Sequence, residues 1–415
     1  MSYNITNGNR VLLIGDKWHY RNNQKLPNDY VNDIYLTLSE FKEISSVDWF
    51  SFDNTISSSS LVSNEKIFFE KIEKKKPDSI VLINTRIPSS DLSVITYKCL
   101  DFIKKLKIPV IAIWSDLQNS DQKYLAQLLK TYTTLNIFTS SSAIFNQVDL
   151  GSSHAFMWVP KSSVYLNNSK FQERHLDVTY LGSPKKERIP FIKYLQKEGI
   201  NLFCGSGESQ SQMSINEYTS ILQKSKICIS FSYFNGIVPV INARTFEVIA
   251  SGSMLLEQAG PETAKLFKPG QEYEIFFTKK ELLEKIKYYL SNQHEIIKIT
   301  SAAKKKYFEY YSADRFWKII FRKLFRYKYF KIKNRSNKFN LATSSELEIL
   351  QNWGFKNTKL DWANLEKIKF SDALLIKIVD VFNCNRWLSP MLYFYLKIVR
   401  LFNRLIYKCL YNLKK

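Results

Sequence analysis

The sequence predicts an α/β fold of two doubly wound domains that face each other across a cleft, followed by a basic helical C-terminal extension. Its 415 residues suggest two domains. Short apolar runs alternate with amphipathic stretches in the manner of parallel sheets covered on both faces. This pattern restarts after a polar link and does not continue into the last quarter. We expect a first domain at 1–160, an interdomain link at 161–176, a second domain at 177–312, a helix at 313–330 and the basic extension at 331–415.

The first domain is expected to hold five strands, because runs such as VLLIG and VIAIW are apolar without alternation. The predicted strands are 10–15, 47–52, 79–84, 109–114 and 136–140. Helices are expected between them, where apolar residues recur at helical spacing. The predicted helices are 32–40, 65–75, 92–106 and 122–131.

The second domain repeats the alternation. Its predicted strands are 177–181, 201–204, 226–231, 253–257 and 272–277. Its predicted helices are 186–197, 216–223, 242–250, 261–266, 279–290 and 295–310. In such sheets ligands bind at the carboxyl ends of the strands, so functional side chains are expected there.

Composition excludes several classes of protein. The 45% hydrophobic and 15% aromatic content excludes a disordered chain. Apolar stretches fall short of the ~20 residues that a spanning helix needs, and the start lacks the pattern of a secretory signal. Five cysteines without a CxxC pair and four scattered histidines predict neither a disulfide framework nor a metal site. We therefore expect a cytoplasmic protein without metal or cofactor.

The positive charge is concentrated near the C-terminus. Residues 315–415 hold 22 Lys and Arg against 6 Asp and Glu, within a chain of net charge +22. Two helical stripes of cations occur there, at 315/318/322/326 and at 397/400/404/408. For the first stripe we favour a helix packed on the protein body. For residues 388–415 we favour an anionic membrane surface, on the inner face of the cell membrane.

A nucleic-acid-binding tail is the rival interpretation of this region, because basic and aromatic residues together can bind phosphates and stack on bases. The cations share helical faces with aliphatic residues, and no RNA-binding module signature is present. We therefore expect no nucleic acid partner.

The most informative stretch is INARTFEVIASGSMLLE, residues 241–257. Asn242 is expected to cap a helix in which Arg244 and Glu247 share one face. An arginine at a helix N-terminus suits a diphosphate, and the carboxylate can accept both hydroxyls of a ribose. Gly252 ends the helix. An intrahelical ion pair on a solvated face explains the same spacing, and the spacing alone favours neither interpretation.

Two glycine turns follow predicted strands. One contains Gly182 and Ser183 with Lys185 beside it, and the other contains Gly205. Small residues let backbone N–H groups approach a phosphate, although each turn alone is equally an ordinary loop.

Three side chains of the first domain are candidates for a general base. Asp16 and Asp116 follow predicted strands, and His154 precedes the link. A carboxylate at a strand end can accept a proton, but it is also a common helix cap. For His154 a packed edge position is the alternative.

The run from Asp177 to Trp317 resembles the second domain of bacterial glycosyltransferases of the GT-B fold. It is most similar to the group that includes the spore-maturation glycosyltransferase-like proteins. The motifs that carry the resemblance are VTYLGSP, INARTFEVIASG, LLEQAGPETAKLFKPGQEYEIFF and KKELLEKIKYYL, with IWSD more weakly in the first domain.

The resemblance implies two Rossmann-like domains, with a nucleotide diphosphate sugar donor on the second and the acceptor on the first. Arg244 would engage the diphosphate and Glu247 the ribose. Gly182 and Ser183 would lie beside the phosphates, with Gly252 on a nearby loop. The helix at 313–330 would return to the first domain. No metal is implied, and the chain has no Asp-x-Asp dyad.

Two positions depart from related enzymes. Where Glu-x7-Glu enzymes carry their first glutamate this chain has Pro239, and Ala243 replaces a glycine that often precedes the arginine.

The function expected is transfer of a hexose to a cell-surface glycan or lipid-linked acceptor, such as growing lipopolysaccharide. Asp116 is the first choice of base, followed by Asp16 and His154. The alternative is a protein of this fold that binds a sugar nucleotide or a glycan without turnover.

Overall fold

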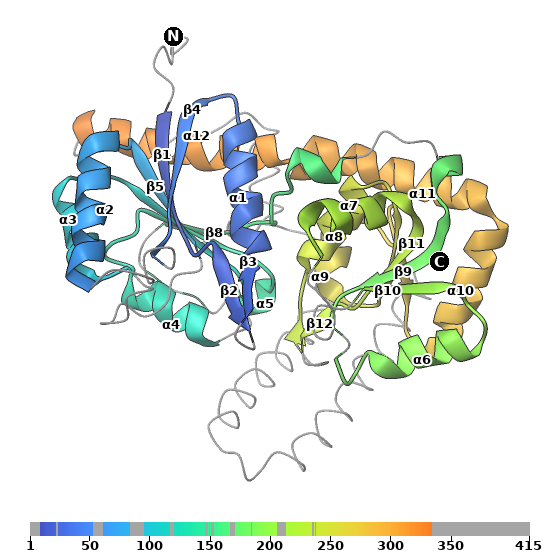
Figure 1. Ribbon diagram of the computed structural model, residues 1–415. Coiled ribbons are helices and arrows are strands. Elements are labelled where there is room, and N and C mark those ends of the chain that lie inside the picture. Colours follow the sequence, from blue (N-terminus) through green and yellow to red (C-terminus); the bar gives the residue numbers. More distant parts are fainter. Residues whose placement is uncertain are drawn as a thin grey trace. The chain divides into compact units, whose positions relative to one another are not determined.

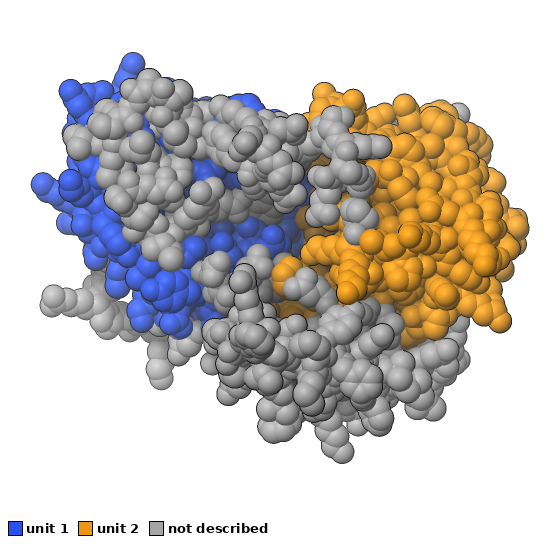
Figure 2. Space-filling model, turned by 60° about the horizontal axis from the view of Figure 1, so that its bottom comes forward, with its two compact units in different colours: residues 1–139, 148–163, 310–358 blue, residues 140–147, 164–309, 359–415 orange. Residues whose placement is uncertain are grey.

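The computed structural model describes residues 9–21, 24–52, 61–83, 95–116, 120–145, 148, 150, 153–166, 171–183, 185–205, 213–234, 236 and 238–333. The chain divides into two compact units (Figures 1 and 2). Unit 1 comprises residues 1–139, 148–163 and 310–358. Unit 2 comprises residues 140–147, 164–309 and 359–415.

Unit 1 contains a six-stranded parallel sheet in the order β4-β1-β5-β6-β7-β8. Its strands are β1 (Asn9–Ile14), β4 (Ile44–Phe50), β5 (Ser79–Ile83), β6 (Val110–Trp114), β7 (Leu135–Phe138) and β8 (Ser153–Phe156). Every residue of β5 and β6 is buried, although successive side chains point to opposite faces. Both faces of this sheet are therefore covered, as the uninterrupted apolar runs predict.

The helices of unit 1 begin at side-chain caps where their starts are described in full. They are α1 (Asp29–Glu40), α2 (Leu61–Lys75), α3 (Tyr97–Lys105), α4 (Ser120–Leu128) and α12 (Ala313–Lys333). Asn28 accepts the backbone N–H of Val31 at the start of α1, and Thr96 accepts that of Cys99 at the start of α3. The Thr96 cap explains why α3 begins later than the predicted start at residue 92.

Helix α12 follows unit 2 in sequence but packs on unit 1. The indole Nε1 of Trp317 donates to Thr37 Oγ1 of α1 at 3.0 Å, and the Phe321 ring stacks on Phe41 at 6.0 Å between centroids. Arg322 of the first basic stripe stays exposed. The helix is thus held by its aromatic face.

Unit 2 contains a five-stranded parallel sheet in the order β10-β9-β11-β14-β15. Its strands are β9 (Leu176–Leu181), β10 (Leu202–Gly205), β11 (Ser225–Ser230), β14 (Met254–Gln258) and β15 (Glu274–Phe276). Its longer helices are α6 (Ile189–Lys197), α7 (Ile215–Lys224), α8 (Ala243–Ala250), α10 (Lys279–Ser291) and α11 (Gln293–Lys306), with the single-turn α9 (Pro261–Ala264).

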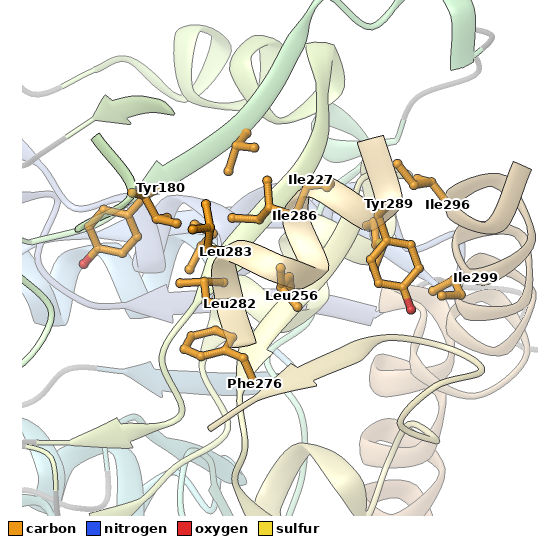
Figure 3. Close-up of a cluster of buried hydrophobic side chains, with 14 of the residues drawn as sticks. Tyr180, Ile227, Leu256, Phe276, Leu282, Leu283, Ile286, Tyr289, Ile296 and Ile299 are labelled. Atoms are coloured by element: carbon orange, nitrogen blue, oxygen red, sulfur yellow. The ribbon is translucent and has the colours of Figure 1, made fainter. Parts of the chain in front are cut away.

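The core of unit 2 joins this sheet to α10 and α11 (Figure 3). Ile227 and Leu256 from neighbouring strands meet Leu282 and Ile286 of α10, and all four side chains are 0% exposed. Burying side chains of this size contributes roughly 1.5–3 kcal/mol each. The sheet is therefore held against α10 by buried apolar side chains.

Short elements lie outside the sequence prediction. They are the antiparallel hairpins β2 (Trp18–Arg21) with β3 (Gln24–Pro27) and β12 (Tyr233–Phe234) with β13 (Val238–Pro239), the edge strand β8, and the four-residue helix α5 (Ser142–Phe145). Elements of two to four residues show no periodicity in sequence, so they cannot be separated from loops by pattern.

The second basic stripe and residues 388–415 lie outside the described residues. Within the part of the chain that the structure describes, no helix combines the length and the apolar character needed to cross a membrane.

Candidate nucleotide-sugar site

The candidate site lies at the carboxyl edge of the unit 2 sheet. Strands β9 and β10 end at Leu181 and Gly205, and the Gly182 N–H donates to the Gly205 carbonyl at 2.9 Å. Helix α8 starts at the same edge, because it precedes β14 and the strands are parallel. The structure therefore brings Gly182, Ser183, Gly205 and Arg244 to one edge of one sheet.

Arg244 lies directly against Gly182. A Cβ atom at position 182 would lie 2.9 Å from Nη2 and 3.0 Å from Nη1 of Arg244. Real Cβ atoms essentially never approach that closely, so this placement of the guanidinium requires glycine. The strand-end glycine thus has a specific role here, which is to admit the arginine.

The charge of Arg244 is fixed by its surroundings. Burial opposes the charge, but Tyr218, Glu247, Cys228 and Tyr180 together raise the pKa of Arg244 above its ordinary value. Its buried Nε has no hydrogen-bond partner among the described residues. An arginine with donor capacity left over at the ligand-binding edge of a sheet is suited to a phosphate oxygen.

Glu247 lies one turn after Arg244 and is only 8% exposed. Its Oε2 accepts a hydrogen bond from the Tyr218 hydroxyl of α7 at 2.6 Å. The alternative of an ion pair on a solvated helix face is wrong, because all of α8 from Thr245 to Ala250 is buried.

Side chains of the same unit hold the turn that follows β9. The Tyr180 hydroxyl donates to the Ser183 carbonyl at 2.7 Å, and Arg188 Nη1 donates to the Tyr180 hydroxyl at 3.3 Å. The Lys185 ammonium lies 4.9 Å from the centre of the Phe234 ring. These contacts hold the Ser183 carbonyl in place, while the Gly182 N–H is bonded to the Gly205 carbonyl.

Asn242 behaves differently from the prediction. It occupies the N-cap position of α8, but its side chain makes no cap hydrogen bond. Its Nδ2 donates instead to the Phe231 carbonyl at 2.5 Å. The predicted capping role is therefore wrong, because the amide ties α8 to the end of β11.

Gly252 is not brought to the site. It follows α8 and precedes β14, at the amino edge of the sheet, with φ +74°. A Cβ atom there would lie 2.8 Å from Nη2 of the buried Arg174, whose guanidinium donates to the carbonyls of Ser225 and Ser251. Gly252 therefore ends the helix as predicted, but it lies at the opposite edge from Arg244.

Glu257, at the end of β14, is a site neighbour that sequence reasoning missed. It is 0% exposed, and its Oε1 accepts from Thr245 Oγ1 at 3.3 Å. Burial raises its pKa to about 7, against the opposing effects of the nearby Thr263, Ser230 and Thr245 hydroxyls and of the Arg244 charge. The only signal in sequence is a glutamate that closes an apolar strand.

The candidate bases of unit 1 divide into two groups. Asp16 follows β1 and Asp116 follows β6, so both lie at the carboxyl edge of that sheet, separated by β5. Asp116 is exposed and has φ +52°. His154 lies within edge strand β8, paired with Asn136. The structure therefore does not bring His154 to the edge that holds the two aspartates.

The described ranges contain no candidate metal site, because no three or more His, Cys, Asp or Glu side chains lie close enough together there to hold an ion. The prediction that the reaction needs no metal stays a prediction.

Comparison with protein families gives one match. Residues 174–321 match the family model described as glycosyl transferase-like. This range covers the sheet of unit 2, the candidate site and the first turns of α12. It confirms the resemblance to glycosyltransferases and supports the prediction of a glycosyltransferase, whereas the narrower likeness to the spore-maturation group stays a prediction. No curated protein matches the sequence.

Solved structures share the fold at low sequence identity. The T4 phage protein BGT, solved with its UDP-glucose substrate, is 14% identical, with 76% of this chain and 98% of that chain covered and a TM-score of 0.50. Sucrose-phosphate synthase from Thermosynechococcus elongatus is 10% identical, with 77% and 100% covered and a TM-score of 0.50. These likenesses confirm the predicted fold class of two Rossmann-like domains and show nothing beyond the fold.

Proposed function

We propose that this chain is a glycosyltransferase that moves a hexose from a nucleotide diphosphate sugar to a cell-surface glycan or lipid-linked acceptor. The observation that carries the proposal is the Arg244 guanidinium seated on Gly182, with Glu247 one helical turn away. Arginine, a helix N-terminus and a glycine turn are the groups that bind a diphosphate. Glu247 is placed to accept hydroxyls of the ribose.

The proposed chemistry breaks the bond between the anomeric carbon and the diphosphate oxygen and forms a bond to an acceptor hydroxyl oxygen. The nucleoside diphosphate leaves with the electron pair, and a base takes the acceptor proton. Arg244 and Lys185 would stabilise the departing charge without a metal. For the base we propose Asp116 first and Asp16 second, with His154 behind them.

The test is a thermal-shift screen of the protein against UDP, GDP, CMP and ADP sugars. At 100 times its dissociation constant a donor should stabilise the fold by ~2.7 kcal/mol. We expect one nucleotide class to give a shift, and we expect Arg244→Ala with Glu247→Ala to abolish it.

Lys226→Ala is the matched control for this screen. Lys226 pairs with Asp177 at 2.7 Å at the amino edge of the same sheet, so its loss should leave the ligand shift unchanged. A shift that persists in the double variant, or no shift with any of the four classes, would overturn the site assignment.

Binding without turnover is the second candidate, and Pro239 is the observation that favours it. Proline offers no carboxylate at the position where Glu-x7-Glu enzymes carry their first glutamate, and here it is buried in β13. Release of free nucleoside diphosphate from the bound donor, measured with and without glycan acceptors, separates the two candidates.

For the basic tail we propose attachment to an anionic membrane surface. Changing Lys397, Arg400, Arg404 and Lys408 to serine should weaken sedimentation with phosphatidylserine vesicles by at least about 100-fold, since each cation near an anionic leaflet contributes about 1 kcal/mol. Donor binding should not change. If the same variant instead binds an oligonucleotide more weakly by a similar factor, while its binding to vesicles is unchanged, the nucleic-acid interpretation is favoured.

A further inference from the structure

Tyr218 of α7 makes a short hydrogen bond to the carboxylate that the proposed function assigns to ribose. Its hydroxyl donates to Glu247 Oε2 at 2.6 Å, within the range of bonds between a hydroxyl and an ionised carboxylate. The two residues come from different helices, 29 positions apart in the chain. This bond therefore ties α7 to the ligand-facing part of α8.

The tyrosine is itself held in place. Helix α7 begins with a capping box in which Ser214 and Glu217 bond reciprocally. The Tyr165 ring lies edge-on to Tyr218 at 6.5 Å between centroids. A phenol fixed in this way offers its single hydrogen in one direction.

The phenol also stays protonated. Burial raises the pKa of Tyr218 well above its ordinary value, and the Glu247 charge raises it further, against the opposing effect of Arg244. A protonated phenol can only donate to a carboxylate, so the contact orients Glu247 at any pH at which that carboxylate is ionised.

We propose that Tyr218 is a positioning residue that aims Glu247 at the ribose hydroxyls and thereby makes the site selective for ribonucleoside over 2′-deoxyribonucleoside diphosphates. This inference rests on the proposed function, because it takes Glu247 to face the ribose. It assigns the selectivity to a residue on a neighbouring helix that the glycosyltransferase-like motifs do not include.

The test is calorimetric titration of the full-length protein with UDP, GDP and ADP and with their 2′-deoxy counterparts. For the diphosphate that binds, we expect the wild type to prefer the ribonucleotide by about 10-fold or more, as loss of a hydrogen bond to a charged group implies. In Tyr218→Phe we expect this ratio to fall to below about 3, with the 2′-deoxy affinity nearly unchanged.

Tyr289→Phe is the matched control. Tyr289 is a buried tyrosine of the same unit whose hydroxyl donates to Glu274 Oε2 at 2.7 Å, so the variant removes the same group from the same kind of bond. Its ribose selectivity should equal that of the wild type. Glu247→Gln is the second variant, which keeps the shape of the side chain and should also lose the selectivity.

Three results would overturn the inference. An unchanged ratio in Tyr218→Phe or in Glu247→Gln would show that this pair does not recognise the ribose. If the ratio in Tyr218→Phe is unchanged because both nucleotides bind more weakly by the same factor, the tyrosine has a packing role only. In either case binding of one of these diphosphates that depends on Arg244 would leave the proposed function standing, whereas binding of none of the three by the wild type would overturn both.

Discussion

Replacing Gly182 by alanine is expected to weaken binding of the nucleotide diphosphate sugar about 10- to 100-fold, while unit 2 stays folded. The added methyl group would lie 2.9–3.2 Å from three atoms of the Arg244 guanidinium, so the guanidinium must move. Hydrogen bonds to charged groups contribute roughly 1.5–3 kcal/mol, which corresponds to this range of affinity. Calorimetric titration with the donor found in the thermal-shift screen measures the loss.

A double-mutant cycle separates this effect from a distorted turn. If the methyl group acts by displacing the guanidinium, Gly182→Ala should cause no further loss in an Arg244→Ala background. An equal loss in both backgrounds would show that the alanine disturbs the backbone or the ligand directly. Within each background, the proteins with glycine and with alanine at position 182 should unfold alike, because the turn remains held by Tyr180 and Arg188.

The sheets of both units could be predicted because parallel strands buried on both faces leave a strong signal. Residues 80–83 and 110–114 are uniformly apolar and lie in the centre of the unit 1 sheet, where no face meets water. The hairpins β2–β3 and β12–β13 are too short to have a period. Their pairing depends on contacts that a single sequence does not display.

The candidate site could be predicted only in part, because some of its contacts join residues that are distant in sequence. Arg244 and Glu247 could be assigned to one face because their spacing of three is local to a helix. Tyr218 could not, since its meeting with Glu247 depends on how α7 packs beside α8. Gly252 was misplaced because a loop next to a site helix in sequence can lie at the opposite edge of the sheet, as it does here over Arg174.

Replacing Glu257 by glutamine is expected to make unit 2 more stable relative to the wild type as pH rises. Burial lifts the pKa of Glu257 to about 7 from an ordinary value of 4.5. Below pH 4.5 the folded and unfolded states are both protonated, and the neutral carboxyl costs nothing extra. Between pH 4.5 and 7 the unfolded state ionises first, so the free energy of unfolding falls as pH rises, and above 7 the loss is complete.

The size of this effect follows from the shift. One pKa unit corresponds to about 1.4 kcal/mol, so the raised pKa of Glu257 implies a loss of about 3 kcal/mol between pH 4.5 and 8. Glutamine has nearly the same shape, can still accept from Thr245 Oγ1, and does not titrate. The advantage of Glu257→Gln over the wild type should therefore grow by about 3 kcal/mol across that range.

Hydrogen exchange of the amides in β11 and β14, compared between variant and wild type at each pH, measures this difference where the carboxyl lies. The amides of β6 in unit 1 are the internal control, and their protection should be the same in both proteins. A difference that stays constant from pH 5 to 8 would mean that Glu257 is already ionised in the folded state, stabilised by Arg244. In that case the buried carboxylate would be a partner of the arginine, and Glu257→Gln would destabilise unit 2 at every pH.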